Sequence, residues 1–575
     1  MSVLAIILVV AVIAAGIVAV VMATRTPSQS SGAAAEPTVR RLIEYVLLFA
    51  LVVVGAIGLA GLLGRLLNVG AELVDGDTPG LARSLAFTLI GGPLAGVLWW
   101  VVWRRASVPG ERSSLAWGLY VAGMSIVSLI TSSSAWLAAA ADLVGGTWHH
   151  QSAATGLVWA GVWIWHQWMA KHRERGPLRL PMVAPILSSA YGLIIGTSGA
   201  VAALGVLFDT AIRRFAIEFT IGHPWWRSML QALVWALGGA LVWWWHWRHA
   251  GVRRVHGPLA HVVLAVVGIL GGSILALSGA GIALYVLLRL GFDPGEPAAQ
   301  ILGPLGNAIA SAAVGALVWS YHDRVALEHS TGIARTARLV AAGVALVAAA
   351  SGVGVIVNSL LAGFGSPLAG SGVRTLLLGG ISSLAVGGPV WWLAWKPTRP
   401  AEPAEASAGR RIYLITVFGL SAVSALVTLL VLGYRLFEFT LADQTGGTLI
   451  DRVRAPLGLF IATGLVAAYH FSVWRGDRSA LAGLSGRKRT IGRVILVAAA
   501  DAEAQKRIIG ECTGAPVTLW LRANTEEPLT DGGADRAMRG PPEDLLIAAL
   551  DGVTGKRVLV VAGPGAAIEV IPLLD

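Results

Sequence analysis

Long apolar segments alternate with short polar ones along most of the chain, and this pattern predicts membrane-spanning helices. Each apolar segment holds about 20 residues with few charges, enough to cross a hydrocarbon core of about 30 Å. The pattern predicts thirteen spans, at roughly 3–23, 42–64, 84–103, 115–140, 153–170, 181–208, 228–247, 259–288, 302–321, 338–362, 375–395, 412–434 and 455–474.

Composition supports the same fold class. The chain of 575 residues is 55% hydrophobic and 13% charged, whereas a soluble protein carries about 25% charged residues. The sequence therefore predicts an all-α polytopic membrane protein with a small α/β domain at its C-terminus.

The net charge of +11 is a topology signal and not a nucleic-acid footprint. From Arg475 onward, thirteen basic and thirteen acidic residues cancel, so the excess lies in short loops between spans. One set of loops holds 20 Lys and Arg residues and the opposite set holds 10. Because basic loops stay in the cytoplasm, we expect the N-terminus outside and the C-terminus inside.

The first span lacks a basic leader and exceeds the usual length of a signal peptide's apolar core. We expect an uncleaved anchor, so that residues 1–39 form an N-terminal anchor and a polar linker.

Six related aromatic endings recur along the membrane region. Examples are LVWWWHWRHA at 241–250 and VWSYHDR at 318–324. Aligning the endings places six residues in one column, at spacings of 65, 80, 76, 72 and 76: Val101, His166, His246, His322, Ala394 and His470. Each ending closes the second helix of a helical hairpin, so the spacing predicts six parallel hairpin repeats.

The repeats set the expected domain boundaries. The membrane region covers 40–475 and the C-terminal domain covers 490–575. The repeats lie at about 40–108, 109–176, 177–255, 256–330, 331–400 and 408–475.

Paired-helix repeats with a W-x-[WY]-H ending resemble an uncharacterised bacterial membrane family called domain of unknown function 5671. The resemblance covers about residues 40–475, and the signature histidine is absent at Val101 and Ala394. It implies a bacterial cytoplasmic (inner) membrane. It implies no established activity and no functional residues.

Tryptophans concentrate in the six endings, which hold 15 of the 23. Trp favours the membrane–water interface, so these endings predict an aromatic and basic belt. The belt residues are Trp100, Trp103, Trp163, Trp165, Trp243, Trp244, Trp245, Trp247, Trp319, Trp391, Trp392 and Trp474.

The histidines of the column are a second, sharper candidate. His166, His246, His322 and His470 occupy equivalent positions and would form a cofactor site if they converged on haem or a metal. No Cys, Asp or Glu accompanies them at a fixed spacing. We therefore expect no cofactor and no metal, and the absence of a catalytic motif predicts a protein that is not an enzyme.

Small and polar residues within the spans indicate helix packing. Glycines recur every third residue from Gly55 to Gly64, and in lipid such residues allow close helix association. Gln231, Asn307 and Asn358 are the few deep polar groups, and we expect them to bridge helices and not to bind substrate.

The C-terminal segment predicts the order β-α-β-α-β-β. Strands are expected at 493–500, 516–524, 556–563 and 566–574, and helices at 501–514 and 541–555. Asp501 is the expected cap of the first helix, and Gly514 and Gly555 are expected at the two helix ends. GVTGKR (552–557) lacks the spacing of a phosphate-binding loop and precedes a strand.

Together these patterns predict a non-catalytic scaffold, complex subunit or regulatory protein. Its expected partners are the lipid bilayer and a protein bound at the cytoplasmic C-terminal domain, without nucleic acid. Two alternatives stay open: a transporter or channel for a small neutral or lipidic solute, and a haem- or metal-binding protein that uses the repeat histidines.

Overall fold

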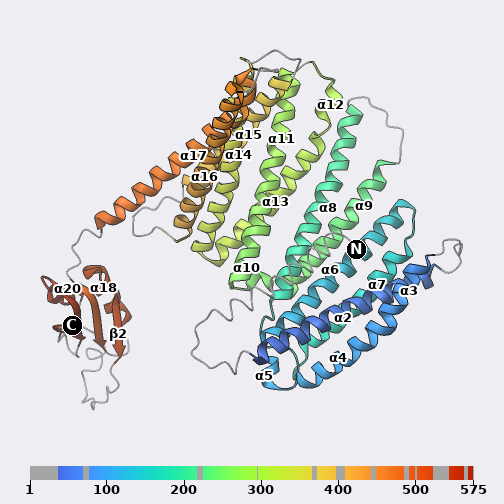
Figure 1. Ribbon diagram of the computed structural model, residues 1–575, viewed down its shortest axis with the longest axis horizontal. Coiled ribbons are helices and arrows are strands. Elements are labelled where there is room, and N and C mark those ends of the chain that lie inside the picture. The colour runs from blue at the N-terminus through green and yellow to red at the C-terminus, as the bar shows by residue number, and fades with distance from the viewer. Residues whose placement is uncertain are drawn as a thin grey trace. The chain divides into compact units, whose positions relative to one another are not determined.

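The computed structural model describes most of the chain from residue 36 onward (Figure 1). The described ranges are 36–68, 77–215, 224–293, 295–364, 372–396, 408–441, 448–484, 491–498, 502–521, 543–562 and 568–573. The predicted first span, the linker up to residue 35 and the question of cleavage lie outside these ranges. Residues 36–39, which the sequence places in the linker, are helical.

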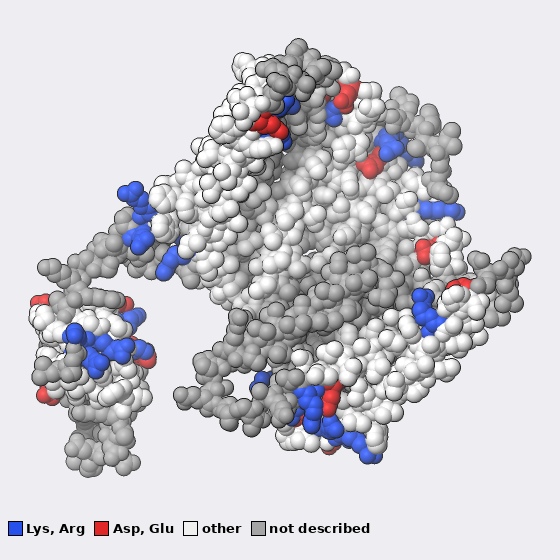
Figure 2. Space-filling model, in the orientation of Figure 1, with Lys and Arg blue, Asp and Glu red and all other residues white. Residues whose placement is uncertain are grey.

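Long apolar helices dominate the described residues. Eleven of them have the length and hydropathy to cross a membrane. They are Arg40–Leu67, Thr78–Arg105, Leu115–Gly145, Val183–Arg214, Trp225–His249, Pro258–Phe292, Ala298–His329, Thr331–Ala362, Gly372–Trp395, Gly409–Leu441 and Leu449–Arg478. Leu89, Leu317 and Leu430 are exposed on them, and charged side chains gather at the helix ends with apolar surface between (Figure 2). An apolar exterior of this kind identifies a membrane protein.

The predicted span at 153–170 is the helix α7 (His150–Lys171). Its Gln, His and Trp residues lower its hydropathy, and it is not among the eleven. It packs against two of the long apolar helices. Tertiary contacts therefore hold in place a helix whose own apolar character is weak.

Several helices contain short interruptions, so the predicted spans divide into more elements. The first half of the helical region contains α2 (Glu36–Leu67), α3 (Thr78–Ala86), η2 (Phe87–Gly91), α4 (Gly92–Arg105), α5 (Pro109–Arg112), α6 (Leu115–Gly145), α8 (Val183–Phe215), α9 (Trp225–Trp244), η3 (Trp245–His249) and η4 (Val252–Arg254). The second half contains α10 (Pro258–Val263), η5 (Leu264–Leu270), α11 (Gly271–Phe292), α12 (Ala298–Leu302), α13 (Leu305–His329), α14 (Thr331–Ala362), α15 (Gly372–Trp395), α16 (Ala408–Leu441) and α17 (Leu449–Leu484).

Consecutive long helices pack as antiparallel pairs through glycine. A Cβ atom on Gly352 would lie 2.6 Å from the backbone nitrogen of Leu384, and one on Gly272 would lie 2.8 Å from that of Trp319. The pairs are α2 with η2 and α4, α6 with α7, α8 with α9, α11 with α13, and α14 with α15. The expected close packing through small residues is confirmed for these pairs.

Successive pairs pack in one regular way. The first helix of a pair contacts the second helix of the pair that follows. These contacts join α2 to α7, α6 to α9, α8 to α13, and α11 to α15. Gly354 of α14 meets Gly458 of α17 in the same manner, with 3.2 Å between the position of its Cβ and the Gly458 carbonyl oxygen. All extensive contacts between the described pairs join sequence neighbours, so the pairs form a row (Figure 1).

Polar side chains cross the junctions between pairs. Gln151 Nε2 donates to the Ala60 carbonyl at 3.3 Å, and Gln231 Nε2 donates to the Ala141 carbonyl at 3.0 Å. Asn307, in the equivalent position of the next pair, packs against Gly205. The prediction that Gln231 bridges helices is confirmed. Each glutamine lies 15 residues before the histidine of its own pair.

In its described residues the C-terminal domain is a four-stranded sheet with two helices. Its elements are β1 (Ile491–Ala498), α18 (Glu503–Thr513), β2 (Val517–Leu521), α20 (Glu543–Leu550), β3 (Gly555–Ala562) and β4 (Ile568–Leu573). The strand order is β2-β1-β3-β4, with β4 antiparallel to β3 and the other pairings parallel. The predicted order of elements is confirmed.

Two predicted helix ends in this domain are wrong. Ala502, and not Asp501, is the N-cap of α18, and Asp501 itself lies outside the described residues. The helix α20 ends at Leu550 and not at Gly555, and Gly552, just beyond the helix, takes the left-handed conformation (φ 78°). Gly555 begins β3, because its backbone pairs with Ile491. Gly514 ends α18 as predicted, with φ 65°.

Packing within the chain divides it into two compact units. The first holds residues 1–399 and 407–467, and the second holds 400–406 and 468–575. The last part of α17 thus belongs to the same unit as the sheet, whereas the sequence places the boundary after residue 475.

Candidate functional site

A large apolar groove lies within the helical unit, among α11, α14, α15 and α16. Its volume is about 1180 Å³. Most of the residues that line it are aliphatic, and examples from the four helices are Ile274, Leu339, Val347, Val386 and Ile412. Along α14 the lining runs from Thr336 to Val355, which at 1.5 Å per residue is about 28 Å. The groove is therefore about as long as the hydrocarbon core is thick.

Missing side-chain volume keeps the groove open. Gly281, Gly343 and Gly379 line it, and a Cβ atom on Gly281 would meet nothing within 4 Å. The helices around it are nevertheless held together, because Ser382 donates to the Gly281 carbonyl and Ser383 donates to the Ala348 carbonyl at 2.7 Å. Small residues thus bring these helices into contact at some positions along their length and leave unfilled volume between them at others.

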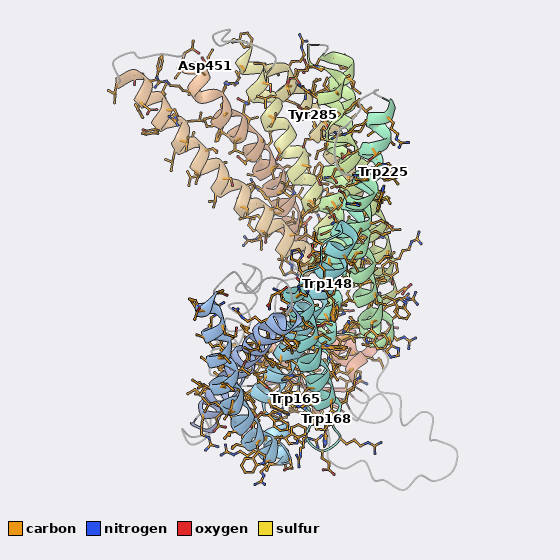
Figure 3. The ribbon with its side chains drawn as sticks, turned by 90° about the vertical axis from the view of Figure 1, so that its right-hand side faces the viewer. Trp148, Trp165, Trp168, Trp225, Tyr285 and Asp451 are labelled. Carbon is orange, nitrogen blue, oxygen red and sulfur yellow. The ribbon has the colours of Figure 1, made fainter. Side chains whose placement is uncertain are left out.

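One end of the groove carries a buried ionic cluster. Tyr285 and Thr375 line this end (Figure 3 labels Tyr285 on α11), and Thr375 Oγ1 donates to Asp293 Oδ2 at 3.2 Å. Arg289 pairs with Asp293 at 3.4 Å and also with Glu296, and its Cζ lies 5.7 Å from the Tyr285 ring. Asp293 is only 2% exposed. A cation with two carboxylate partners therefore stands beside an apolar channel.

A second buried arginine stands near the other end. Tyr413 lines the groove there, and its ring centroid lies 5.2 Å from that of Trp395. The Arg410 guanidinium sits 4.8 Å from the Trp395 ring and is buried. Both ends of the groove thus combine a tyrosine with an arginine, which suits an elongated molecule with an apolar middle and polar ends.

The four repeat histidines are all buried. In three of them Nδ1 lies at hydrogen-bond distance from the valine carbonyl four residues earlier: 2.8 Å for His166, 2.9 Å for His246 and 2.7 Å for His322. Since a carbonyl oxygen only accepts, Nδ1 carries the proton and Nε2 is the nitrogen left to accept or to ligate.

The surroundings of two of these histidines belong to helix packing. His166 Nε2 lies 3.1 Å from the Tyr120 hydroxyl of α6. The His322 ring fills the space over Gly268, where any Cβ would lie 2.5 Å from the ring. Among the described residues, no group of three or more His, Cys, Asp or Glu side chains is arranged to hold a metal ion. The described residues therefore offer no cluster of three such ligands around these histidines.

The predicted belt tryptophans divide into three groups by the exposure of their side chains. Trp100, Trp244, Trp245 and Trp392 are exposed on the helix surface, and the Arg104 guanidinium lies 3.8 Å from the Trp100 ring. Trp103 and Trp247 are instead buried, and Trp247 Nε1 donates to the Tyr321 hydroxyl at 2.8 Å. The remaining six are half-buried. Figure 3 shows Trp165 near the end of α7, while Trp225 lies at the start of α9, the opposite end of that helix from its aromatic ending.

Sequence reasoning did not find the groove. Two of the glycines that line the groove face a large side chain on the neighbouring helix and not its backbone. A Cβ atom on Gly379 would lie 3.7 Å from the ring of Tyr285, and one on Gly343 would lie 3.7 Å from the ring of Tyr413. Glycines with no close helix backbone leave volume unfilled, but a sequence alone does not say which helices flank them.

Comparison with known proteins gives one match. Residues 41–164, 183–305 and 335–465 each match the family described as "Domain of unknown function (DUF5671)". The first match covers α2, α4, α6 and most of α7, which are two helix pairs. No curated protein and no solved structure matches the chain. Because the three matched segments cover well over half of the 575 residues, the chain belongs to this family, and the domain occurs three times along it.

Proposed function

We propose that the membrane region contains thirteen spans, as one N-terminal anchor and six parallel two-helix repeats. Five antiparallel pairs, the spacing of the aromatic endings and the two-pair length of the family match support this arrangement. With the basic loops in the cytoplasm, the protein sits in a bacterial inner membrane with its N-terminus outside and its sheet domain inside.

We propose that the protein binds a lipid-like molecule in the groove among α11, α14, α15 and α16. The single observation that carries this proposal is the length of the apolar lining, about 28 Å along α14. Such a length fits an extended acyl or isoprenoid chain better than a compact solute. The protein is then a lipid-handling membrane protein, which narrows the transporter alternative to a lipidic cargo.

The polar groups along the groove fit binding and not chemistry. Ser382 and Ser383 donate to backbone carbonyls, so their hydroxyl protons are engaged. Arg410, beside one end, carries the charge that would suit the phosphate of an amphiphile, whereas Arg289 at the other end is already paired with Asp293 and Glu296. Within a bilayer, selection of the occupant comes from packing and from these polar ends, because lipid tails are as apolar as the groove itself.

The proposal can be tested with a variant whose bulky side chain fills the groove. We expect Gly281→Trp to place an indole in the groove without a backbone clash, since open space surrounds this position. The full chain in nanodiscs would carry a phospholipid with a photoactivatable acyl chain, and labelled peptides would be mapped by mass spectrometry. Labelling of groove residues of α14 should fall about tenfold, the effect of a loss of roughly 1.4 kcal/mol.

Gly291→Trp is the matched control. It lies on the same helix, also has open space around it, and does not line the groove. Labelling near exposed Leu89 serves as the reference for ordinary bilayer contact. Equal labelling of α14 in wild type and Gly281→Trp, or wild-type labelling no stronger at α14 than near Leu89, would rule out a lipid site in the groove.

A second candidate function is partner docking by the sheet domain. Trp520, on the edge strand β2, is 57% exposed, and Leu521 beside it is also exposed. An edge strand with exposed apolar side chains is a template for an added strand. We expect Trp520→Lys to abolish co-purification of a protein partner while Thr518→Lys, an exposed position on the same face, preserves it. Retention of the partner by Trp520→Lys would contradict this role.

A further inference from the structure

A second, polar cavity lies where α9 and α13 end, apart from the apolar groove. Its volume is about 390 Å³. It is formed by η3, the connection that follows η3, and the last turn of α13. Its lining residues are Trp247, Arg248, Gly251, Arg253, Arg254, His256, Glu328 and His329. This is the end of the helix pair that carries the WWWHW stretch.

The charge of this cavity is strongly positive. Three arginines line it against one carboxylate, and that carboxylate is already engaged, because Arg253 Nη2 donates to Glu328 Oε2 at 2.6 Å. This hydrogen bond holds the pKa of Arg253 above its usual range. Arg248 and Arg254 are exposed and form no ion pair among the described residues. The three arginines and the one carboxylate of the lining thus leave an excess of two positive charges.

Two imidazoles complete the wall. The ring centroids of His256 and His329 lie 4.7 Å apart. His256 Nδ1 donates to the Arg254 carbonyl at 2.9 Å, and His329 Nδ1 donates to the Val325 carbonyl at 2.8 Å. In both rings Nε2 is therefore left to contact a ligand. A protonated Nε2 would donate to an anion directly, and an unprotonated Nε2 would contact it through a water molecule.

A defined backbone turn shapes this cavity. Gly251 has φ 78°, a conformation that favours glycine, and it turns the chain from η3 into η4. Val252 is then buried as an anchor, which leaves Arg253 and Arg254 at the cavity. Trp247 is fixed on the other wall by its hydrogen bond to Tyr321. The basic groups are thus presented by a defined turn and a buried anchor.

We propose that this cavity binds the phosphate group of an anionic phospholipid. Arginine recognises phosphate oxygens through paired N–H donors, and two of the three guanidiniums here lack a carboxylate partner in the described structure. Exposed Trp244 and Trp245 lie one turn or less from the cavity and mark the level of the bilayer interface. Basic cavities between helix ends at this level are suited to anionic lipid headgroups.

The test uses the purified full chain and phosphatidylglycerol, with phosphatidylcholine as the lipid without net charge. Native mass spectrometry would report the affinity for each lipid. We expect preference for phosphatidylglycerol, and we expect Arg248→Gln/Arg254→Gln to weaken its binding about 25-fold, a factor of about five per arginine near a membrane surface. Both side chains are exposed, so the thermal unfolding midpoint should stay unchanged and confirm that the variant is folded.

The matched control is Arg104→Gln/Arg173→Gln, which removes the same charge at the same end of two other helix pairs. It should change the affinity by less than about twofold. An equal loss in both double variants, or no loss in Arg248→Gln/Arg254→Gln, would overturn the proposal. Glycerol 3-phosphate and inorganic phosphate are added in separate arms. If either binds as tightly as the lipid, and if its affinity also falls about 25-fold in the variant, the cavity binds a soluble phosphate compound and the proposal of a phospholipid is wrong.

Discussion

Gly239→Ala is expected to destabilise the helical unit by about 2–3 kcal/mol, the usual effect of forcing extra volume into a packed interface. A Cβ atom on Gly239 would lie 2.6 Å from Gly196 Cα and 2.8 Å from the Ile195 carbonyl carbon. Both are backbone atoms of α8, which moves only as a whole. The helix propensity of alanine offsets the loss by no more than about 1 kcal/mol.

The neighbouring glycine provides the control. The three atoms nearest to a Cβ atom on Gly238 all belong to the side chain of Leu137, which has other rotamers. Gly238→Ala should therefore change the unfolding free energy by less than about 1 kcal/mol. Denaturant unfolding in mixed micelles, followed by tryptophan fluorescence, measures both variants. If Gly238→Ala is the more damaging of the two, the backbone contact between α8 and α9 does not limit stability.

Arg289→Met is expected to destabilise the protein by about 3 kcal/mol, because breaking a buried ion pair leaves an uncompensated charge. The Asp293 carboxylate is almost fully buried and would keep the hydrogen bond from the Thr375 hydroxyl but lose its cationic partner. Methionine preserves the apolar stem of arginine, so the change isolates the charge. The midpoint of thermal unfolding in detergent would report the loss.

Arg65→Met provides the comparison for this second substitution. Arg65 pairs with Asp77 at 2.6 Å, but both side chains are exposed, at 37% and 62%. Exposed pairs contribute up to about 1 kcal/mol, so this variant should remain close to wild type. Equal losses in Arg289→Met and Arg65→Met would mean that the burial of the Arg289 cluster does not determine its contribution.

The helix pairs are predictable from the sequence, and their junctions are partly so. The recurring endings identify pairs because each aromatic–basic ending needs a membrane interface. Gln151, Gln231 and Asn307 share one register with the repeat histidines, so their common role at the junctions between pairs was available from spacing alone. Their partners on the preceding helix were not available, because the row of pairs is a tertiary arrangement.

The groove and the basic cavity were not predictable, for different physical reasons. The groove exists where packing fails to fill space around Gly281, and unfilled volume has no signature in composition. The basic cavity depends on the turn at Gly251, which brings two short basic stretches together. At the sequence level Arg248, Arg253 and Arg254 read only as topology signals. At the start of α18 the sequence was misleading in another way: aspartate is a favoured N-cap residue, but the N-cap is Ala502, one position after Asp501.

The row of pairs has a consequence for how the protein is made. Each first helix presents a face that only the second helix of the next pair covers, as α8 is covered by α13. During synthesis this face meets lipid until the following hairpin has been inserted, and the docking of each hairpin completes the one before it. We therefore expect the hairpins to dock in the order of their translation. After α17 the chain continues into the sheet domain and not into another helix pair. The helix α16 therefore has no following pair to cover it and keeps apolar side chains exposed, such as Leu420 at 68% and Leu430 at 67%.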